Sequence, residues 1–99
     1  MTILREKSET ALPRLMLQKE SFDLAYVDGS HVASNVLFDG VMAGRLLKVG
    51  GILVFDDYKW PDAKEGNGPK EGIDAFILAH QTSFEVLDSG YQVVLQKNQ

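Results

Sequence analysis

Acidic side chains follow two apolar runs in this sequence, at the point where each run ends. Asp56 and Asp57 come directly after "ILVF", and Asp28 comes directly after "LAYV". Adjacent carboxylates repel one another, and burying one without a partner is costly. If the two runs form neighbouring strands, the three carboxylates gather at one edge of a sheet, where a hard cation such as Mg²⁺ or Ca²⁺ would offset their repulsion. Because strand alternation would point Asp56 and Asp57 to opposite faces, joint binding requires the chain to turn at Asp57.

These aspartates also have interpretations that involve no metal. A short polar residue after a strand often caps the helix that follows, and Asp28 lies shortly before the apolar stripe that begins at Val32. An acidic pair in a loop is commonly solvated. The residues alone leave these alternatives open.

Three other side chains lie close to the aspartates in sequence. Histidine is the side chain best suited to accept a proton near neutral pH, so His31 could act as a general base or could simply lie in a loop. Tyr58 and Trp60 could form an apolar wall over a ligand or could pack within the fold. The glycines of Gly66–Gly72 do not have the spacing of a dinucleotide-binding turn.

The pattern of apolar residues predicts the elements that must position these side chains. Strands are predicted at Thr2–Leu4, Phe22–Asp28 and Gly51–Asp57, with a hairpin around Asp88–Gly90, and helices at Ser8–Glu20, Val32–Lys48 and Ile73–Gln81. This alternation predicts an α/β fold with a mainly parallel sheet and a C-terminal antiparallel hairpin.

Two finer predictions follow from the same pattern. The almost uniformly apolar run before Asp56 predicts a strand that is covered on both faces. The glycine pair Gly50–Gly51 is predicted to end the helix over Val32–Lys48, and Pro61–Gly72 is predicted to be a loop.

Length and composition limit the classes of protein that are compatible with the sequence. The 99 residues suffice for one small domain, and a net charge of −4 argues against nucleic acid or an anionic membrane as the main partner. The absence of cysteine excludes disulfides and thiolate metal sites and fits a cytoplasmic protein. The sequence has neither a signal-peptide pattern nor an apolar stretch near the ~18 residues of a membrane span.

Longer motifs around the aspartates resemble a known family. "FDLAYVDGSH" and "LLKVGGILVFDDYKWP" are similar to the C-terminal half of class I S-adenosylmethionine-dependent methyltransferases, nearest to the metal-dependent small-molecule O-methyltransferases of the macrocin and catechol types. "TILREKSETALPRL" resembles the third strand of that family with its helix, and "GIDAFILAHQTSFEVLDSGYQVVLQK" resembles its last helix and closing strands. The resemblance implies a partial Rossmann-like methyltransferase sheet, with residues 1–99 forming a single partial domain from the third strand to the seventh.

The resemblance also implies a set of metal ligands. In the metal-dependent members, residues at the ends of the fourth and fifth strands hold Mg²⁺ against the substrate hydroxyl. The matching positions in this chain are Asp28, Asp56 and Asp57.

The general base of the family lies two or three residues after the first metal ligand, where this chain has Ser30 and His31. Neither residue is the aspartate or lysine of the best-understood members, and His31 is the better candidate. Ser30, Tyr58 and Trp60 are assigned to the wall of the substrate or cofactor site.

The implied cofactors are S-adenosylmethionine and Mg²⁺ or a similar divalent ion, and the implied substrate is a small-molecule hydroxyl. The family binds S-adenosylmethionine mainly through a Gly-rich turn after its first strand, and this sequence contains no such turn. The chain is therefore expected to lack the N-terminal cofactor-binding half and to be inactive alone. It would be the metal and substrate half of an O-methyltransferase, a truncated non-catalytic binding or interaction module, or a divalent-ion or phosphate-binding domain that only looks like a methyltransferase.

The resemblance has a consequence for the sheet. The family order is 3-2-1-4-5-7-6, so a sheet without strands 1 and 2 leaves an unpaired edge on the strand at Phe22–Asp28. Three arrangements would cover it: pairing with the strand at Thr2–Leu4, pairing with a second copy, or a complementing chain. The expected partners are the substrate and a homodimer or complementing chain through the exposed sheet edge, with neither nucleic acid nor membrane.

Overall fold

The computed structural model describes residues 3–6, 22–28, 31–61 and 66–99. Its elements are β1 (Ile3–Glu6), β2 (Phe22–Val27), α2 (Ala33–Leu46), β3 (Leu47–Phe55), α3 (Pro69–Ala79), β4 (Phe84–Ser89) and β5 (Val93–Lys97). The strands form one sheet in the order β1-β2-β3-β5-β4, parallel from β1 to β3 and antiparallel from β3 through β5 to β4. This mixed sheet confirms the predicted α/β class. The predicted helix at Ser8–Glu20 lies outside the described residues.

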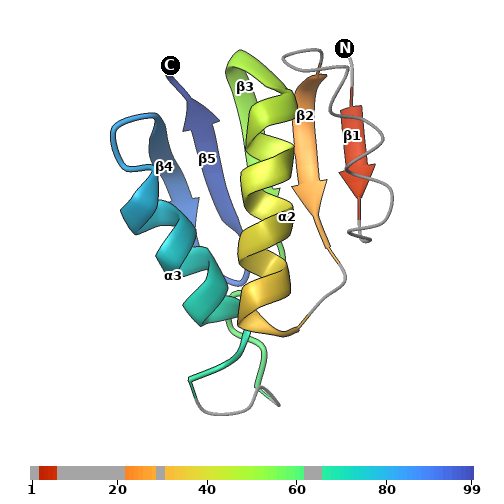
Figure 1. Cartoon of the computed structure of the whole chain (residues 1–99), viewed down its shortest axis with the longest axis vertical. Helices are drawn as coiled ribbons and strands as arrows, with labels where there is room; N and C mark the ends of the chain where they lie inside the picture. Colours follow the sequence, from red (N-terminus) through yellow and green to blue (C-terminus); the bar gives the residue numbers. More distant parts are fainter. Residues whose placement is uncertain (1–2, 7–21, 29–30, 62–65) are drawn as a thin grey trace.

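The two described helices, α2 and α3, both lie on the same face of the sheet (Figure 1). The core between these layers combines strand and helix residues that are almost fully buried: Ala25, Val27, Leu53, Phe55, Val93 and Leu95 from the sheet, with Val36, Ala43, Ile73 and Phe76 from the helices. On the other face of β3, Ile52 and Val54 are only partly buried. Both described helices cover one face of β3, and the helix predicted at Ser8–Glu20, which bears on cover of the other face, lies outside the described residues.

The edge of β2 is covered by β1. The two strands pair in parallel from Ile3 opposite Leu24 to Glu6 opposite Val27. Of the three arrangements expected to cover this edge, the structure shows the first. The predicted strand at Thr2–Leu4 is confirmed as an element, although the observed β1 lies slightly later.

The end of α2 differs from the prediction. The helix ends at Leu46, and Leu47 is already extended, with φ −77° and ψ 143°. Lys97 Nζ donates to the carbonyl oxygens of Gly44 and Leu47, each at 2.8 Å, so a distant lysine satisfies the carbonyls at the end of the helix. Gly50, with φ +90°, instead lies in the stretch of β3 where the pairing with β2 shifts register. Glycine is suited to this stretch because it adopts positive φ without a steric penalty.

The beginning of α3 also differs from the prediction. The helix starts at Pro69 and not at Ile73, so the predicted loop is too long at its C-terminal end. Proline is favoured in the first helical turn because its missing N–H has no intrahelical partner there. The Glu71 carboxylate accepts a hydrogen bond from the Gly68 N–H at 2.9 Å, which completes the cap. The hairpin is confirmed, but its turn lies at residues 90–92 and not at Asp88–Gly90, because Asp88 and Ser89 still pair with β5.

None of the helices in the described ranges is long and apolar enough to cross a membrane.

Close contact between the two helices depends on a glycine. Gly72 lies on α3 against the start of α2, and a Cβ atom at this position would lie 2.5 Å from the Ala33 carbonyl oxygen and 3.0 Å from Val36 Cβ. Because the nearer atom belongs to the backbone, it cannot move aside as a flexible side chain could.

Gly72→Ala should therefore destabilise the protein. Alanine normally stabilises a helix by about 1 kcal/mol relative to glycine, but overpacking a close contact costs about 1–3 kcal/mol, and we expect the clash to dominate. Urea unfolding measures the difference. Gly90→Ala is the matched control, because no atom lies within 4 Å of its added Cβ. Equal stability of the two variants would contradict the close packing of α2 and α3.

Candidate metal centre

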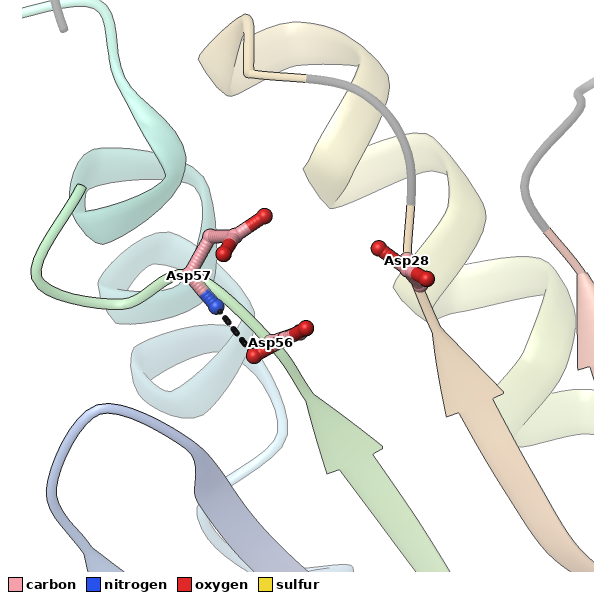
Figure 2. A group of neighbouring side chains, drawn as sticks. All are labelled: Asp28, Asp56 and Asp57. Atoms are coloured by element: carbon pink, nitrogen blue, oxygen red, sulfur yellow. Dashed lines mark hydrogen bonds between the residues drawn. The ribbon is translucent and has the colours of Figure 1, made fainter. Parts of the chain in front are cut away.

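Three carboxylates meet at the edge of the sheet where the parallel strands end. Asp28, Asp56 and Asp57 each offer a carboxylate oxygen, and these oxygens lie within 4.8 Å of one another (Figure 2). The pairing of β2 with β3 brings them together, because Val27 lies opposite Phe55 and each strand is followed directly by its aspartate. The Asp56 N–H also donates to the Val27 carbonyl oxygen at 3.1 Å, which continues the pairing to the site.

A turn at Asp57 lets both neighbouring aspartates take part. Asp57 has φ +63° and is the one non-glycine residue with positive φ in the described ranges. Aspartate tolerates this left-handed conformation better than most residues. The Asp57 N–H donates to Asp56 Oδ1 at 2.9 Å, so the first carboxylate is held by the backbone of the second. Strand alternation is thereby broken where joint binding requires it.

His31 contacts this cluster. Its Nε2 lies 2.8 Å from Asp57 Oδ2, and its ring stacks on Trp60 with centroids 3.9 Å apart and planes 12° from parallel. If the bond to the carboxylate carries the proton on Nε2, the imidazole nitrogen that remains to accept a proton is Nδ1. The structure thus brings two of the predicted site residues, His31 and Trp60, together with the carboxylates.

Tyr58, another predicted wall residue, is placed differently from Trp60. The Tyr58 ring packs against the hydrophobic core, and its hydroxyl donates to Asp74 Oδ1 on α3 at 2.7 Å. The contacts of Tyr58 are therefore those of a residue that packs within the fold, which was one of its two predicted roles. Ser30 lies outside the described residues.

The sequence interpretation missed two residues that touch the carboxylates. The Tyr91 hydroxyl donates to Asp57 Oδ1 at 2.7 Å, and Gln92 Nε2 lies 3.4 Å from Asp56 Oδ1. Both belong to the β4–β5 connection. The available signal was topological: a strand antiparallel to β3 must begin at the edge where β3 ends, so the residues before it reach the aspartates.

The donor set fits a hard divalent cation. Carboxylate oxygens are the ligands that Mg²⁺ and Ca²⁺ prefer. Within the described ranges, Asp28 has neither a hydrogen-bond partner nor an ion pair, and the one ion pair that any of the three aspartates forms is that of Asp57 with His31. Three acidic groups this close repel one another, and a divalent cation would offset that repulsion.

Ligand-type side chains beyond the carboxyl ends of parallel strands are typical of Rossmann-like α/β proteins. The sequence profile of a methyltransferase domain family matches residues 1–58, which is more than half of the chain. The chain therefore belongs to this methyltransferase domain family. No curated protein matches it.

Solved structures share the fold. The MycE methyltransferase from the mycinamycin biosynthetic pathway, in complex with Mg and SAH, has a TM-score of 0.66 and 20% identity, covering 93% of this chain and 30% of MycE. The MycE complex with Mg, SAH and mycinamycin VI has the same TM-score and identity over 89% of this chain and 28% of MycE. A protein from Corynebacterium glutamicum has a TM-score of 0.57 and 21% identity, covering 87% of this chain and 44% of that protein.

This chain thus spans less than half the length of these structures. At this level of identity the likeness establishes a shared fold. It confirms the predicted Rossmann-like methyltransferase sheet, and together with the family match it confirms the resemblance to class I methyltransferases.

The contact of Tyr91 with the cluster predicts a pH dependence of stability. Its hydrogen bond to Asp57 and, secondarily, partial burial and the nearby negative charge raise the pKa of Tyr91 from 10.0 to about 12. Below pH 10 the hydroxyl is protonated in both folded and unfolded chains. Between pH 10 and about 12 the unfolded chain binds fewer protons than the folded chain, so the free energy of unfolding should fall as pH rises.

Urea unfolding across this pH window, compared between the unmodified chain and Tyr91→Phe, measures the effect. The decline should be shallower in the variant, because phenylalanine has no titrating group. The contribution of Tyr58, whose pKa is also raised, mainly by burial and then by Asp74, is present in both proteins and cancels. Parallel declines would contradict the Tyr91–Asp57 bond.

Proposed function

We propose that this chain is the metal- and substrate-binding part of an S-adenosylmethionine-dependent O-methyltransferase that acts on a small-molecule hydroxyl. The observation that carries the proposal is the convergence of Asp28, Asp56 and Asp57 at the carboxyl edge of the parallel strands. Membership of a methyltransferase domain family and the shared fold with MycE, whose structures contain Mg and SAH, support it.

In this proposal Asp28, Asp56 and Asp57 hold a divalent ion, with Mg²⁺ the natural choice. Such an ion, when bound, supplies positive charge that lowers the pKa of a substrate hydroxyl. The carboxylates lie beside β2 and β3 on a rigid sheet edge, which fixes where the hydroxyl must sit. Positioning of this kind accounts for a large part of the barrier reduction in group-transfer reactions.

His31 is the proposed general base. Asp57 holds the ring through Nε2, and Trp60 holds its face, so Nδ1 accepts the hydroxyl proton. The substrate oxygen then forms a bond to the methyl carbon as the bond from that carbon to the sulfonium sulfur breaks, and the sulfur keeps the electron pair. Trp60, together with Ser30, is proposed to form part of the wall around the reactants.

A specific observation favours a second candidate function, a non-catalytic methyltransferase-like module. β1, which resembles the third strand of the family, pairs directly with β2, which resembles the fourth. In the family order 3-2-1-4-5-7-6, strands 2 and 1 lie between these positions. Strand 1 is the one that leads into the Gly-rich turn for the cofactor. With β1 in this place, a cofactor-binding half from elsewhere would have to displace it.

The same observation bears on partners. A complementing chain, or a second copy of this chain, is proposed to engage the sheet edge that β1 now covers or the outer edge of β1 itself. Parallel edge strands are templates for such pairing because their backbone donors and acceptors are unpaired on one side.

The metal assignment predicts the effect of Asp56→Asn. Removing one of three converging charges should weaken Mg²⁺ binding by at least about ten-fold while leaving the fold intact, because the amide keeps the size of the side chain. Calorimetric titration with Mg²⁺ measures the affinity, and circular dichroism checks the fold. Asp88→Asn, at an exposed position of β4, is the matched control and should bind as the unmodified chain does. Unchanged Mg²⁺ affinity in Asp56→Asn would refute the metal site.

Titration with S-adenosylmethionine tests whether the chain builds a cofactor site by itself. The folded chain alone should not bind S-adenosylmethionine at micromolar concentration, with or without Mg²⁺, because it has no Gly-rich turn and β1 lies where the cofactor-binding strands would insert. Light scattering in the same samples reports the mass. Micromolar binding would contradict this expectation and would show that the chain, alone or self-associated, builds a cofactor site, so that an enzyme assay with Mg²⁺ would follow.

A further inference from the structure

The β4–β5 connection reaches the carboxylate cluster from the side opposite β2. Because β5 is antiparallel to β3, with Val93 opposite Phe55, the residues before Val93 lie beside the residues after Phe55. The backbone fixes this approach: the Tyr58 N–H donates to the Tyr91 carbonyl oxygen at 2.9 Å, and the Gly90 N–H donates to the Gln92 carbonyl oxygen at 2.9 Å. The connection is therefore tied to the segment that carries the aspartates.

Its two polar side chains each contact a different aspartate. The Tyr91 hydroxyl donates to Asp57 Oδ1 at 2.7 Å. Gln92 Nε2 lies 2.7 Å from the Tyr26 hydroxyl on β2 and 3.4 Å from Asp56 Oδ1. Gln92 thus spans the two strands that end in the site.

With these contacts, Asp57 is held at both carboxylate oxygens. Oδ1 accepts from Tyr91, and Oδ2 lies 2.8 Å from His31 Nε2. Asp56 is held at Oδ1, by the Asp57 N–H and by Gln92. Each carboxylate oxygen has two lone pairs, so an oxygen that accepts one hydrogen bond can still bind a cation. What the donors remove is rotation: a carboxylate fixed in this way cannot turn to present both oxygens to one ion.

This restriction discriminates between cations. Mg²⁺ requires nearly ideal octahedral geometry at short distances and usually keeps several waters, whereas Ca²⁺ accepts more oxygen ligands in a flexible geometry, with carboxylates that bind through one oxygen or both. Donors that orient ligating groups typically change metal affinity 10–100-fold when they are lost.

We propose that Tyr91 and Gln92 are positioning residues that hold Asp57 and Asp56 in single-oxygen geometry and thereby make the site select Mg²⁺ over Ca²⁺. This inference rests on the proposed metal site.

Calorimetric titration of the full chain with Mg²⁺ and, separately, with Ca²⁺ tests the proposal. In Tyr91→Phe, Mg²⁺ affinity should fall by about ten-fold or more, and Ca²⁺ affinity should fall less, because the freed carboxylate can turn to bind through both oxygens. The ratio of Mg²⁺ to Ca²⁺ affinity should therefore fall. Gln92→Ala should change the ratio in the same direction and serves as the second variant if Tyr91→Phe does not fold.

Gln96→Ala is the matched control. Gln96 lies on β5, the strand that begins directly after Gln92, but at its far end from the carboxylates. Its amide donates to the Gly50 carbonyl oxygen. Both affinities should be unchanged in this variant.

Three results would separate the possibilities. Absence of Mg²⁺ binding in the unmodified chain would overturn the proposed metal site itself. Binding in the unmodified chain with unchanged affinities in folded Tyr91→Phe and Gln92→Ala would overturn the positioning role alone. Equal losses of Mg²⁺ and Ca²⁺ affinity would indicate a merely structural role and would overturn the selectivity.

Discussion

The parallel pairing of β2 with β3 is the constraint on which the candidate site depends. The register that sets Val27 opposite Phe55 places the two strand ends, and hence their aspartates, side by side. A shift by one residue would reverse which side chains face the helices, so the buried residues on both strands hold the register in place. Ala25, Val27, Leu53 and Phe55 are all at most 5% exposed. The hydrophobic core therefore fixes the spacing of the charged groups.

In the cluster, repulsion between the carboxylates opposes the packing that brings the two strand ends together. Three carboxylates lie together at the sheet edge, and His31, Tyr91 and Gln92 contact two of them from different elements. A site that brings like charges together without a cation costs folding free energy, and such local costs are typical of functional sites. The left-handed backbone of Asp57 is another local cost of this kind. The conformation ends the strand and turns the Asp57 side chain towards the cluster.

The place of β1 departs from the strand order that the resemblance gives for a complete sheet of the family. On the strand assignment that the resemblance implies, the observed order β1-β2-β3-β5-β4 would read 3-4-5-7-6, with the third strand against the fourth. Pairing with β1 satisfies the backbone groups along the edge of β2, which a sheet cannot leave open without a risk of unwanted pairing. The carboxylate edge is formed by β2, β3 and the start of β5, so the candidate metal centre does not depend on the position of β1.

The sequence by itself determined the α/β class, the central helix, the apolar strands and the identity of the acidic residues, because these follow from local periodicity and from motifs of adjacent residues. It misjudged the end of α2 and the start of α3. Gly50 lies in an irregularity of β3 and not at the end of α2, whose carbonyl oxygen at Gly44 accepts instead from Lys97, far along the chain. Pro69 begins α3 and does not belong to the loop.

Only the tertiary structure decided which partners the aspartates have. The pairing of the strands and the reach of Tyr91 and Gln92 depend on contacts between residues that are far apart in the sequence, such as the 34 positions that separate Tyr91 from Asp57. Such contacts leave no periodic signal in the sequence, because they are fixed by how the strands pair and not by the local preferences of the residues.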